Sequence, residues 1–202
     1  PDCPAKHVKA FAHMASRDAL NIEGMSEATI EKFVGAGFLR EPADFFRLDR
    51  FRDQITRMEG FGEKSFENLV KAADKARHST PARVLYSLGI NGIGLANAKL
   101  IVRNAGGDFE AIRRLDHDRL RDMEGIGPVL ADSFTAYFRD ADNLAKLDAL
   151  LGELTLEAPA APAGNALSGL TFVITGSLEQ FENREALKEA IDKSVAAVML
   201  EP

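Results

Sequence analysis

The chain has 202 residues, a hydrophobic content of 46% and a formal net charge of −6 at neutral pH, so it is long enough to bury the core of one or two domains. No apolar run approaches the about 20 residues of a membrane span, the first residues do not resemble a signal peptide, and the single cysteine excludes an internal disulfide and favours a reducing compartment. The negative charge disfavours tight nucleic-acid binding unless groups other than cationic side chains receive the phosphates.

Residues 1–18 carry candidate metal ligands. Cys3 and His7 stand four residues apart and could share a metal ion. A structural zinc site, however, needs four ligands and usually contains paired cysteines. Surface histidines and a leftover cysteine explain this stretch better, so we predict that the chain folds without zinc.

A short glycine pattern recurs four times between residues 19 and 154, at intervals of 32 to 36 residues. In each copy an apolar residue stands two positions before a first glycine, and another follows it directly. A second glycine comes next in three copies, whereas the first copy has Ser26 at this position. The first glycines are Gly24, Gly60, Gly92 and Gly125, and the second glycines are Gly62, Gly94 and Gly127. Such a repeat indicates a copied structural unit rather than a catalytic loop.

Two further apolar positions follow each first glycine by six and nine residues. They are Ile30 and Phe33, Phe66 and Leu69, Ala98 and Ile101, and Ala131 and Phe134. Positions three apart share one helix face, and glycine permits the positive φ of a tight turn. Each copy therefore predicts a helix, a turn and a helix, and residues 19–154 predict a mainly α domain of four tandem helix-hairpin-helix units.

The second helix of each unit begins at the glycine turn, where its first N–H groups have no intrahelical partner. These groups and the helix dipole suit a phosphate oxygen, and such contacts do not read base sequence. Backbone amides also bind phosphate without adding net charge, and several weak contacts raise the effective concentration. The alternative is that the hairpins only pack or bind proteins.

Cationic side chains distinguish the copies. The third copy has Lys99 and Arg103, four apart on one helix face, and the second has Lys64 and Lys71, whereas the first and fourth carry more acids than bases. We expect the third hairpin to contribute most to DNA binding. The predicted DNA-binding residues are Gly60, Gly62, Lys64, Lys71, Gly92, Gly94, Lys99, Arg103, Gly125 and Gly127.

The C-terminal quarter of the chain changes in composition. Residues 155–166 are rich in Ala and Pro without an apolar period, which predicts an interdomain linker. Residues 167–202 then show a β-rich run closed by Gly176, a segment with helical spacing and a second apolar run. This order indicates a separate α/β domain. A segment of 36 residues buries little core alone, so we expect a partial domain.

Taken in order, these segments resemble the C-terminal part of bacterial NAD-dependent DNA ligases. "CPAKHVKAFAHMASRDALNIEGM" resembles the end of the family's zinc finger, "EGFGEKSFENL", "LYSLGINGIGLANAKL" and "EGIGPVLADSF" resemble its hairpins, and "LSGLTFVITGSLEQFENREALKEAI" resembles the start of its BRCT domain. The resemblance implies a zinc-finger remnant (1–18), a tandem helix-hairpin-helix domain (19–154), a linker (155–166) and a partial BRCT-like segment (167–202). Since the chain starts without Met and ends abruptly, we expect it to be a part of a longer protein.

Departures from the family pattern limit what this chain can do. Of the four zinc-binding cysteines of the family only Cys3 is present, and Lys193 and Ser194 replace a Gly-Gly of the BRCT domain. The family's adenylated lysine lies in a Lys-x-Asp-Gly motif that does not occur here. By resemblance the parent enzyme uses NAD, magnesium and structural zinc to seal nicks in replication and repair. The fragment is expected to be inactive, without cofactors of its own.

The resemblance further implies that this chain binds nicked double-stranded DNA as a monomer in the bacterial cytoplasm. One alternative is a tandem-hairpin module of another repair or recombination protein, against which the BRCT-like start argues. Another is a helical protein-interaction domain without a role on DNA. An intact enzyme is disfavoured because no paired-carboxylate, triad or P-loop constellation stands in the sequence.

Overall fold

The computed structural model describes residues 4–157, and these residues form one compact unit. Their elements are α1 (Pro4–Ala15), α2 (Glu27–Gly35), η1 (Pro42–Phe46), η2 (Leu48–Phe51), α3 (Arg52–Ile55), α4 (Glu63–Ala76), β1 (His78–Ser79), α5 (Pro81–Ser87), α6 (Leu95–Asn104), α7 (Phe109–Arg113), α8 (His117–Arg121), α9 (Pro128–Arg139), α10 (Ala141–Leu151) and β2 (Thr155–Leu156). The predicted mainly α class is confirmed. No helix in this part of the chain is long and apolar enough to cross a bilayer.

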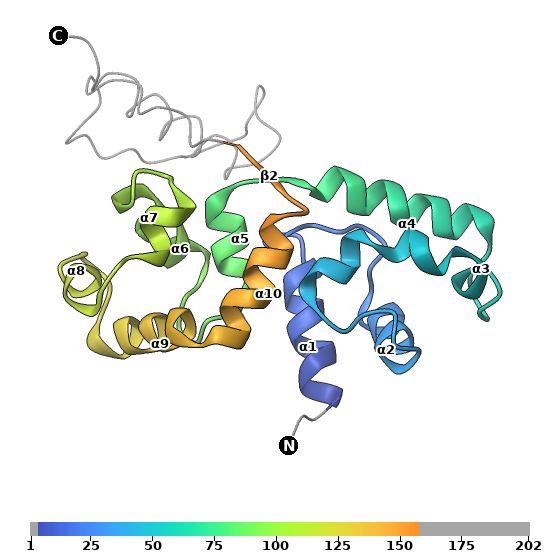
Figure 1. Cartoon of the computed structure of the whole chain (residues 1–202), viewed down its shortest axis with the longest axis horizontal. Helices are drawn as coiled ribbons and strands as arrows, with labels where there is room; N and C mark the ends of the chain where they lie inside the picture. Colours follow the sequence, from blue (N-terminus) through green and yellow to red (C-terminus); the bar gives the residue numbers. More distant parts are fainter. Residues whose placement is uncertain (1–3, 158–202) are drawn as a thin grey trace, which may run out of the picture. The chain divides into compact units, whose positions relative to one another are not determined.

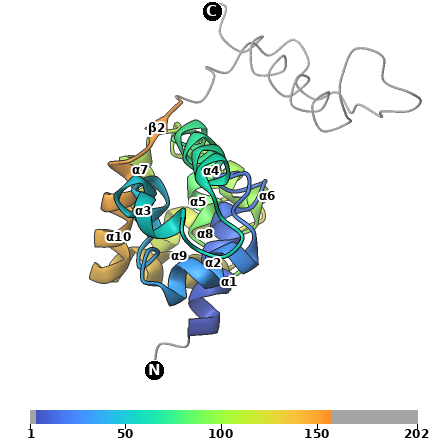
Figure 2. The ribbon, with the colours of Figure 1, turned by 90° about the vertical axis from the view of Figure 1, so that its right-hand side faces the viewer.

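The four predicted hairpins are present as helix pairs. They are α1–α2, α3–α4, α5–α6 and α8–α9, with η1 and η2 between the first two and α7 between the last two. In Figure 1 the elements α2, α3 and α4 lie at one end of the described unit, α6 to α9 lie at the other end, and α1, α5 and α10 lie between them. Figure 2 shows the unit from the end where α3 and α4 lie.

The apolar repeat positions form the core, as the helical spacing predicted. In each copy these are the apolar residues two positions before the first glycine and one, six and nine positions after it. All of them are buried except Met58 and Phe61, which are half-buried and pack against the core. The larger side chains Ile30, Phe33 and Phe134 are fully buried. Since each hairpin is too small to bury an apolar face alone, the repeats stabilise one another through this shared core.

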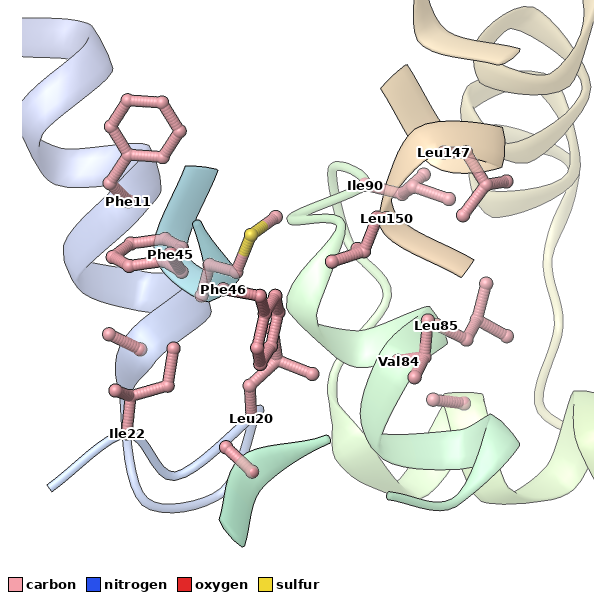
Figure 3. Close-up of a cluster of buried hydrophobic side chains, with 14 of the residues drawn as sticks. Phe11, Leu20, Ile22, Phe45, Phe46, Val84, Leu85, Ile90, Leu147 and Leu150 are labelled. Carbon is pink, nitrogen blue, oxygen red and sulfur yellow. The ribbon is translucent and has the colours of Figure 1, made fainter. Parts of the chain in front are cut away.

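A central cluster joins the two halves of the unit. Side chains from α1, η1, α5 and α10 meet there, as Figure 3 shows. The labelled members are Phe11, Leu20, Ile22, Phe45, Phe46, Val84, Leu85, Ile90, Leu147 and Leu150. The burial of Phe11 and Met14 of α1 changes the predicted domain boundary. Residues 4–18 belong to the hairpin domain rather than to a separate remnant, because α1 is the first helix of the first hairpin and packs against α2.

The C-terminal end of the unit also differs from the prediction. β2 pairs in parallel with β1, and Thr155 N–H donates to Arg77 O at 2.7 Å while Glu157 N–H donates to Ser79 O at 2.8 Å. The backbone of residues 155–157 is therefore hydrogen-bonded into the domain, which the Ala- and Pro-rich composition did not reveal. The rest of the predicted linker, the BRCT-like segment and Cys3 lie outside the described residues.

Candidate nucleic-acid interface

All four turns have the same hydrogen bond. The residue after the first glycine donates its N–H to the carbonyl three positions earlier: Met25 to Ile22 (3.2 Å), Phe61 to Met58 (3.0 Å), Ile93 to Ile90 (3.0 Å) and Ile126 to Met123 (3.0 Å). The first glycines have φ values of +80°, +86°, +78° and +95°. A positive φ at the third position is the requirement of a type II turn, and glycine meets it without steric cost.

The residue two positions after each first glycine is the N-cap of the following helix. Gly62, Gly94 and Gly127 have extended backbones there, with φ of −148°, −79° and −81°. Ser26 is also extended, and its Oγ accepts the N–H of Thr29 at 3.2 Å. Serine is a favoured N-cap, which explains why the first copy departs from glycine and still forms the hairpin.

The four helices begin in the same register. The first N–H to carbonyl bonds are Ile30 to Ser26 (2.9 Å), Phe66 to Gly62 (3.0 Å), Ala98 to Gly94 (2.9 Å) and Ala131 to Gly127 (3.1 Å). The N–H groups that precede these in each first helical turn have no backbone acceptor within the helix, but Ser26 Oγ accepts that of Thr29 and Pro128 has no N–H. Each turn thus presents a small set of backbone donors at the positive end of a helix dipole, the arrangement that binds phosphate oxygens.

The second glycines are not needed for the fold itself. A Cβ atom added at Gly62, Gly94 or Gly127 would meet nothing within 4 Å, and their φ values are open to any residue. The absence of a side chain at these three positions leaves the backbone donors open to close approach from outside the chain.

The first glycines lie where the hairpins pack in pairs, and at Gly92 this packing leaves no room for a Cβ. A Cβ at Gly24 would lie 3.8 Å from Leu69, and one at Gly60 would lie 3.8 Å from Lys32 Nζ. In the other half, a Cβ at Gly92 would lie 2.4 Å from Leu130, and one at Gly125 would lie 4.0 Å from Leu100. Each turn therefore packs against the second helix of its partner, which pairs the first hairpin with the second and the third with the fourth.

The predicted cationic residues lie on the surface, but in different electrostatic surroundings. Lys64 and Lys71 are exposed on α4, and Lys99 and Arg103 are exposed on α6. The four cations and the six predicted glycines thus lie on the second helices and turns of hairpins two to four, and whether they form a single DNA-facing surface stays a prediction.

Carboxylates surround the turns of the first pair. Glu23 and Glu27 flank the first turn, and Glu59 and Glu63 flank the second. Nearby, Arg52 donates to Glu63 at 2.6 Å and to Glu67 at 3.5 Å, and the hydrogen bond to Glu63 raises the pKa of Arg52 above its ordinary value. Arg52 thus offsets part of the negative charge beside the second turn.

The turns of the second pair carry fewer acids. Asn91 and Glu124 precede the first glycines, and the first turns of α6 and α9 contain no acidic residue. Val129, in the first turn of α9, is 71% exposed. Asp132 lies 3.1 Å from His117 Nε2. The local field at the third turn is therefore the one most favourable to phosphate.

One cation near a turn was not predicted. Lys32 of α2 donates from Nζ to the carbonyl of Glu59 at 3.1 Å and lies 5.9 Å from the centre of the Phe61 ring. A cation of the first hairpin thus stands at the turn of the second. The sequence marks Lys32 only as an exposed helical residue, because the pairing of the two hairpins is tertiary.

Two family models match this chain, and their boundaries correspond to the two hairpin pairs of the structure. A family model of the SAM-like helix-hairpin-helix tandem matches residues 16–75, and a model of the helix-hairpin-helix motif matches residues 83–147. The first match holds most of the first hairpin pair, and the second holds most of the second pair.

Curated relatives extend the similarity over nearly the whole chain. The protein named DNA ligase from Lachnoclostridium phytofermentans is 49% identical over 194 residues, covering 96% of this chain and 30% of the relative. The DNA ligase from Ruminiclostridium cellulolyticum is 42% identical over 193 residues (95% and 29%), and that from Symbiobacterium thermophilum is 39% identical over 186 residues (91% and 28%). The chain spans about 30% of the length of these relatives.

Proposed function

We propose that this chain, which belongs to the bacterial DNA ligase family, binds duplex DNA without reading its sequence, through the turns and second-helix N-termini of its four hairpins. The homology over more than nine-tenths of the chain and the two helix-hairpin-helix matches support this role. The catalytic steps belong to parts of the parent protein that this chain does not contain.

The observation that carries the proposal is the second glycine of the turns. At Gly62, Gly94 and Gly127 neither the backbone φ nor the space around a Cβ requires glycine. The N–H groups of the following helix turn, which have no intrahelical partner, stand beside them, except that Pro128 after Gly127 has no N–H. A phosphate that approaches these donors benefits from the missing side chain, and backbone donors resolve the conflict with the net charge of −6.

For the parent protein we propose a nick-sealing, NAD-dependent ligase that uses magnesium and structural zinc. The resemblance of the sequence to that family supports these cofactors, and Cys3 would be one zinc ligand of the parent. The described residues contain no group of three or more His, Cys, Asp or Glu that could hold a metal. Within the parent, this chain would hold the duplex while the catalytic parts close around the nick, as a monomer in the bacterial cytoplasm.

The direct test is a salt titration of binding between the 202-residue chain and a nicked duplex, with an intact duplex and a single strand as comparisons. We expect binding to both duplexes irrespective of base sequence, with a log–log salt slope of about −0.9 for each phosphate contacted. Binding that is absent, or that does not weaken with salt, would instead favour a protein-interaction domain.

A further inference from the structure

A cavity of about 670 Å³ opens between the two halves of the described unit. One wall is α1, and the opposite wall is formed by α10 and the end of α9. The segment 87–93, which leads into the turn of the third hairpin, closes one side. Its volume lies in the range of clefts that bind ligands of nucleotide size, about 300 to 1,000 Å³.

The polar lining of this cavity is basic. Lys6 and Lys9 come from α1, Lys146 comes from α10, and Arg40 stands beside the start of η1. None of the residues that line the cavity is Asp or Glu, although the whole chain carries a net charge of −6. Lys6 and Lys9 are three residues apart on one helix face. Among the described residues, no ion pair engages Lys6, Lys9 or Lys146.

The wall next to the third hairpin contains two glycines between larger side chains such as Leu88 and Asn91. Gly89 and Gly92 both line the cavity and have φ of +65° and +78°. Behind Gly89, the ring of His13 donates from Nε2 to the carbonyl of Tyr86 at 2.8 Å, so α1 is fixed against this segment. The same turn therefore borders the cavity on one side and leads into the donor-bearing N-terminus of α6 on the other.

We propose that this basic cavity is a second phosphate-binding site, which receives the backbone of the DNA strand held at the third hairpin. The proposal rests on the proposed function, because it takes the third turn as a point of phosphate contact. A strand that leaves that turn meets Lys6 and Lys9 from one wall and Lys146 from the other. Lysines are depleted in protein–protein interfaces, whereas a cation cluster without acids is the footprint of nucleic acid.

The test compares three variants of the 202-residue chain in a salt titration with nicked duplex. The cavity variant carries Lys6→Ala, Lys9→Ala and Lys146→Ala. The control variant carries Arg50→Ala, Lys75→Ala and Arg139→Ala, which lie outside this cavity and change the net charge equally. A third variant replaces the three cavity lysines by arginine. All six positions are exposed, so thermal unfolding of each variant should match the wild type.

We expect the cavity variant to bind more weakly, with a salt slope reduced in magnitude by up to about 2.7, since each lost contact contributes about 0.9. The arginine variant should keep the wild-type slope. Equal slopes for the cavity and control variants would overturn the proposal. If the wild type binds no DNA at all, the proposed function itself fails. This outcome differs from the failure of the cavity proposal, in which the wild type binds but the cavity variant behaves like the control.

A competition arm identifies the source of the phosphate. Inorganic pyrophosphate and ATP are titrated against duplex binding at constant ionic strength. A site built for the DNA backbone predicts no displacement beyond that of an equal ionic strength of sodium chloride. Displacement at low pyrophosphate or ATP concentration that the cavity variant abolishes would show a small-molecule phosphate site, and would overturn the assignment to the DNA strand.

Discussion

The two small residues of each hairpin turn differ in conformation and in surroundings. Gly92 has φ of +78°, and a Cβ there would lie 2.4 Å from Leu130. Gly94 has φ of −79°, and a Cβ there would meet nothing within 4 Å. In the third hairpin the first glycine is therefore a requirement of folding and hairpin pairing, whereas the second is free to serve an outside ligand.

This difference gives a matched pair of substitutions. Gly94→Ala should leave the fold intact, because its φ is open to alanine, but should weaken DNA binding on the order of tenfold, the equivalent of about 1.4 kcal/mol. Gly92→Ala should lower the free energy of unfolding by about 1 to 2 kcal/mol from the backbone alone, with a further cost at Leu130. Denaturant unfolding measures the stability of each variant, and titration with duplex DNA measures its affinity. If a folded Gly94→Ala variant binds DNA with the wild-type affinity, the DNA phosphate does not contact this turn.

Glu153 holds the end of α10 to the first half of the unit. Its carboxylate accepts from Arg47 Nε at 2.6 Å and from Arg77 Nη1 at 2.6 Å. Arg77 also donates to the carbonyl of Phe46 at 2.7 Å. Burial acts to raise the pKa of Glu153, but the hydrogen bonds from Arg77 and Arg47 outweigh it, so the pKa lies below its ordinary value.

A lowered pKa of Glu153 makes the stability depend on pH. The stabilisation is fully present above the unfolded-state pKa, about 4.3, and is lost as the pH falls through the lower folded-state pKa. Glu153→Gln should therefore cost about 1 to 3 kcal/mol at pH 7, and the difference from wild type should vanish in acid. Unfolding measured from pH 7 to pH 3 tests this. Glu63→Gln, in an exposed pair with Arg52, is the control and should change stability little, because solvent screens such pairs.

The hairpins share one backbone design but differ in the charges of their second helices. Lys99 and Arg103 are both exposed on α6, whereas the equivalents of Lys99 are Glu31, Glu67 and Asp132. All four helices begin in the same register and offer backbone donors, but Ser26 Oγ occupies the N–H of Thr29 in the first and Pro128 of the fourth has no N–H. The main difference between hairpins therefore lies in the side chains, and it favours the third.

Changing Lys99 and Arg103 together to Ala should weaken binding to all duplex sequences. It should also reduce the magnitude of the salt slope by about two, since each phosphate contact contributes about 0.9. Glu67→Ala, at the same helical position of the second hairpin, serves as the matched control and should keep or tighten binding. A double variant with the wild-type affinity and salt slope would locate the DNA elsewhere.

At the scale of the whole described unit, two hairpin pairs act as one body. α10 packs against both η1 and α9, and α1 packs against both α2 and α5. The central cluster in Figure 3 draws its side chains from both halves. A duplex held by all four turns would therefore meet donors in fixed positions, which suits a part that holds DNA for catalysis elsewhere.

The chain by itself should carry out no ligation chemistry, because the Lys-x-Asp-Gly motif is missing. Incubation of the purified chain with NAD and magnesium should give no increase in mass by one AMP and no joining of a nicked duplex. Detection of the AMP adduct by intact-mass spectrometry would contradict this prediction. Addition of an active ligase to the same reaction provides the positive control for the substrate.

The local sequence by itself determined the hairpins. A first glycine between two apolar residues specifies a type II turn, because only glycine takes its positive φ freely. The apolar residues six and nine positions later specify the buried face of the following helix, because residues three apart lie on the same face. Even the exception at Ser26 follows local chemistry, since serine caps a helix as well as glycine does.

Only the tertiary structure decided how the hairpins combine. The pairing that brings Lys32 to the turn at Glu59, the basic cavity between Lys6, Lys9 and Lys146, and the parallel pairing of Thr155 with His78 all join residues far apart in the chain. Local periodicity carries no information on such contacts, because they are set by which surfaces remain to be buried once the helices have formed. The sequence therefore predicted the donors of each turn, and the packing alone decided which cations stand beside them.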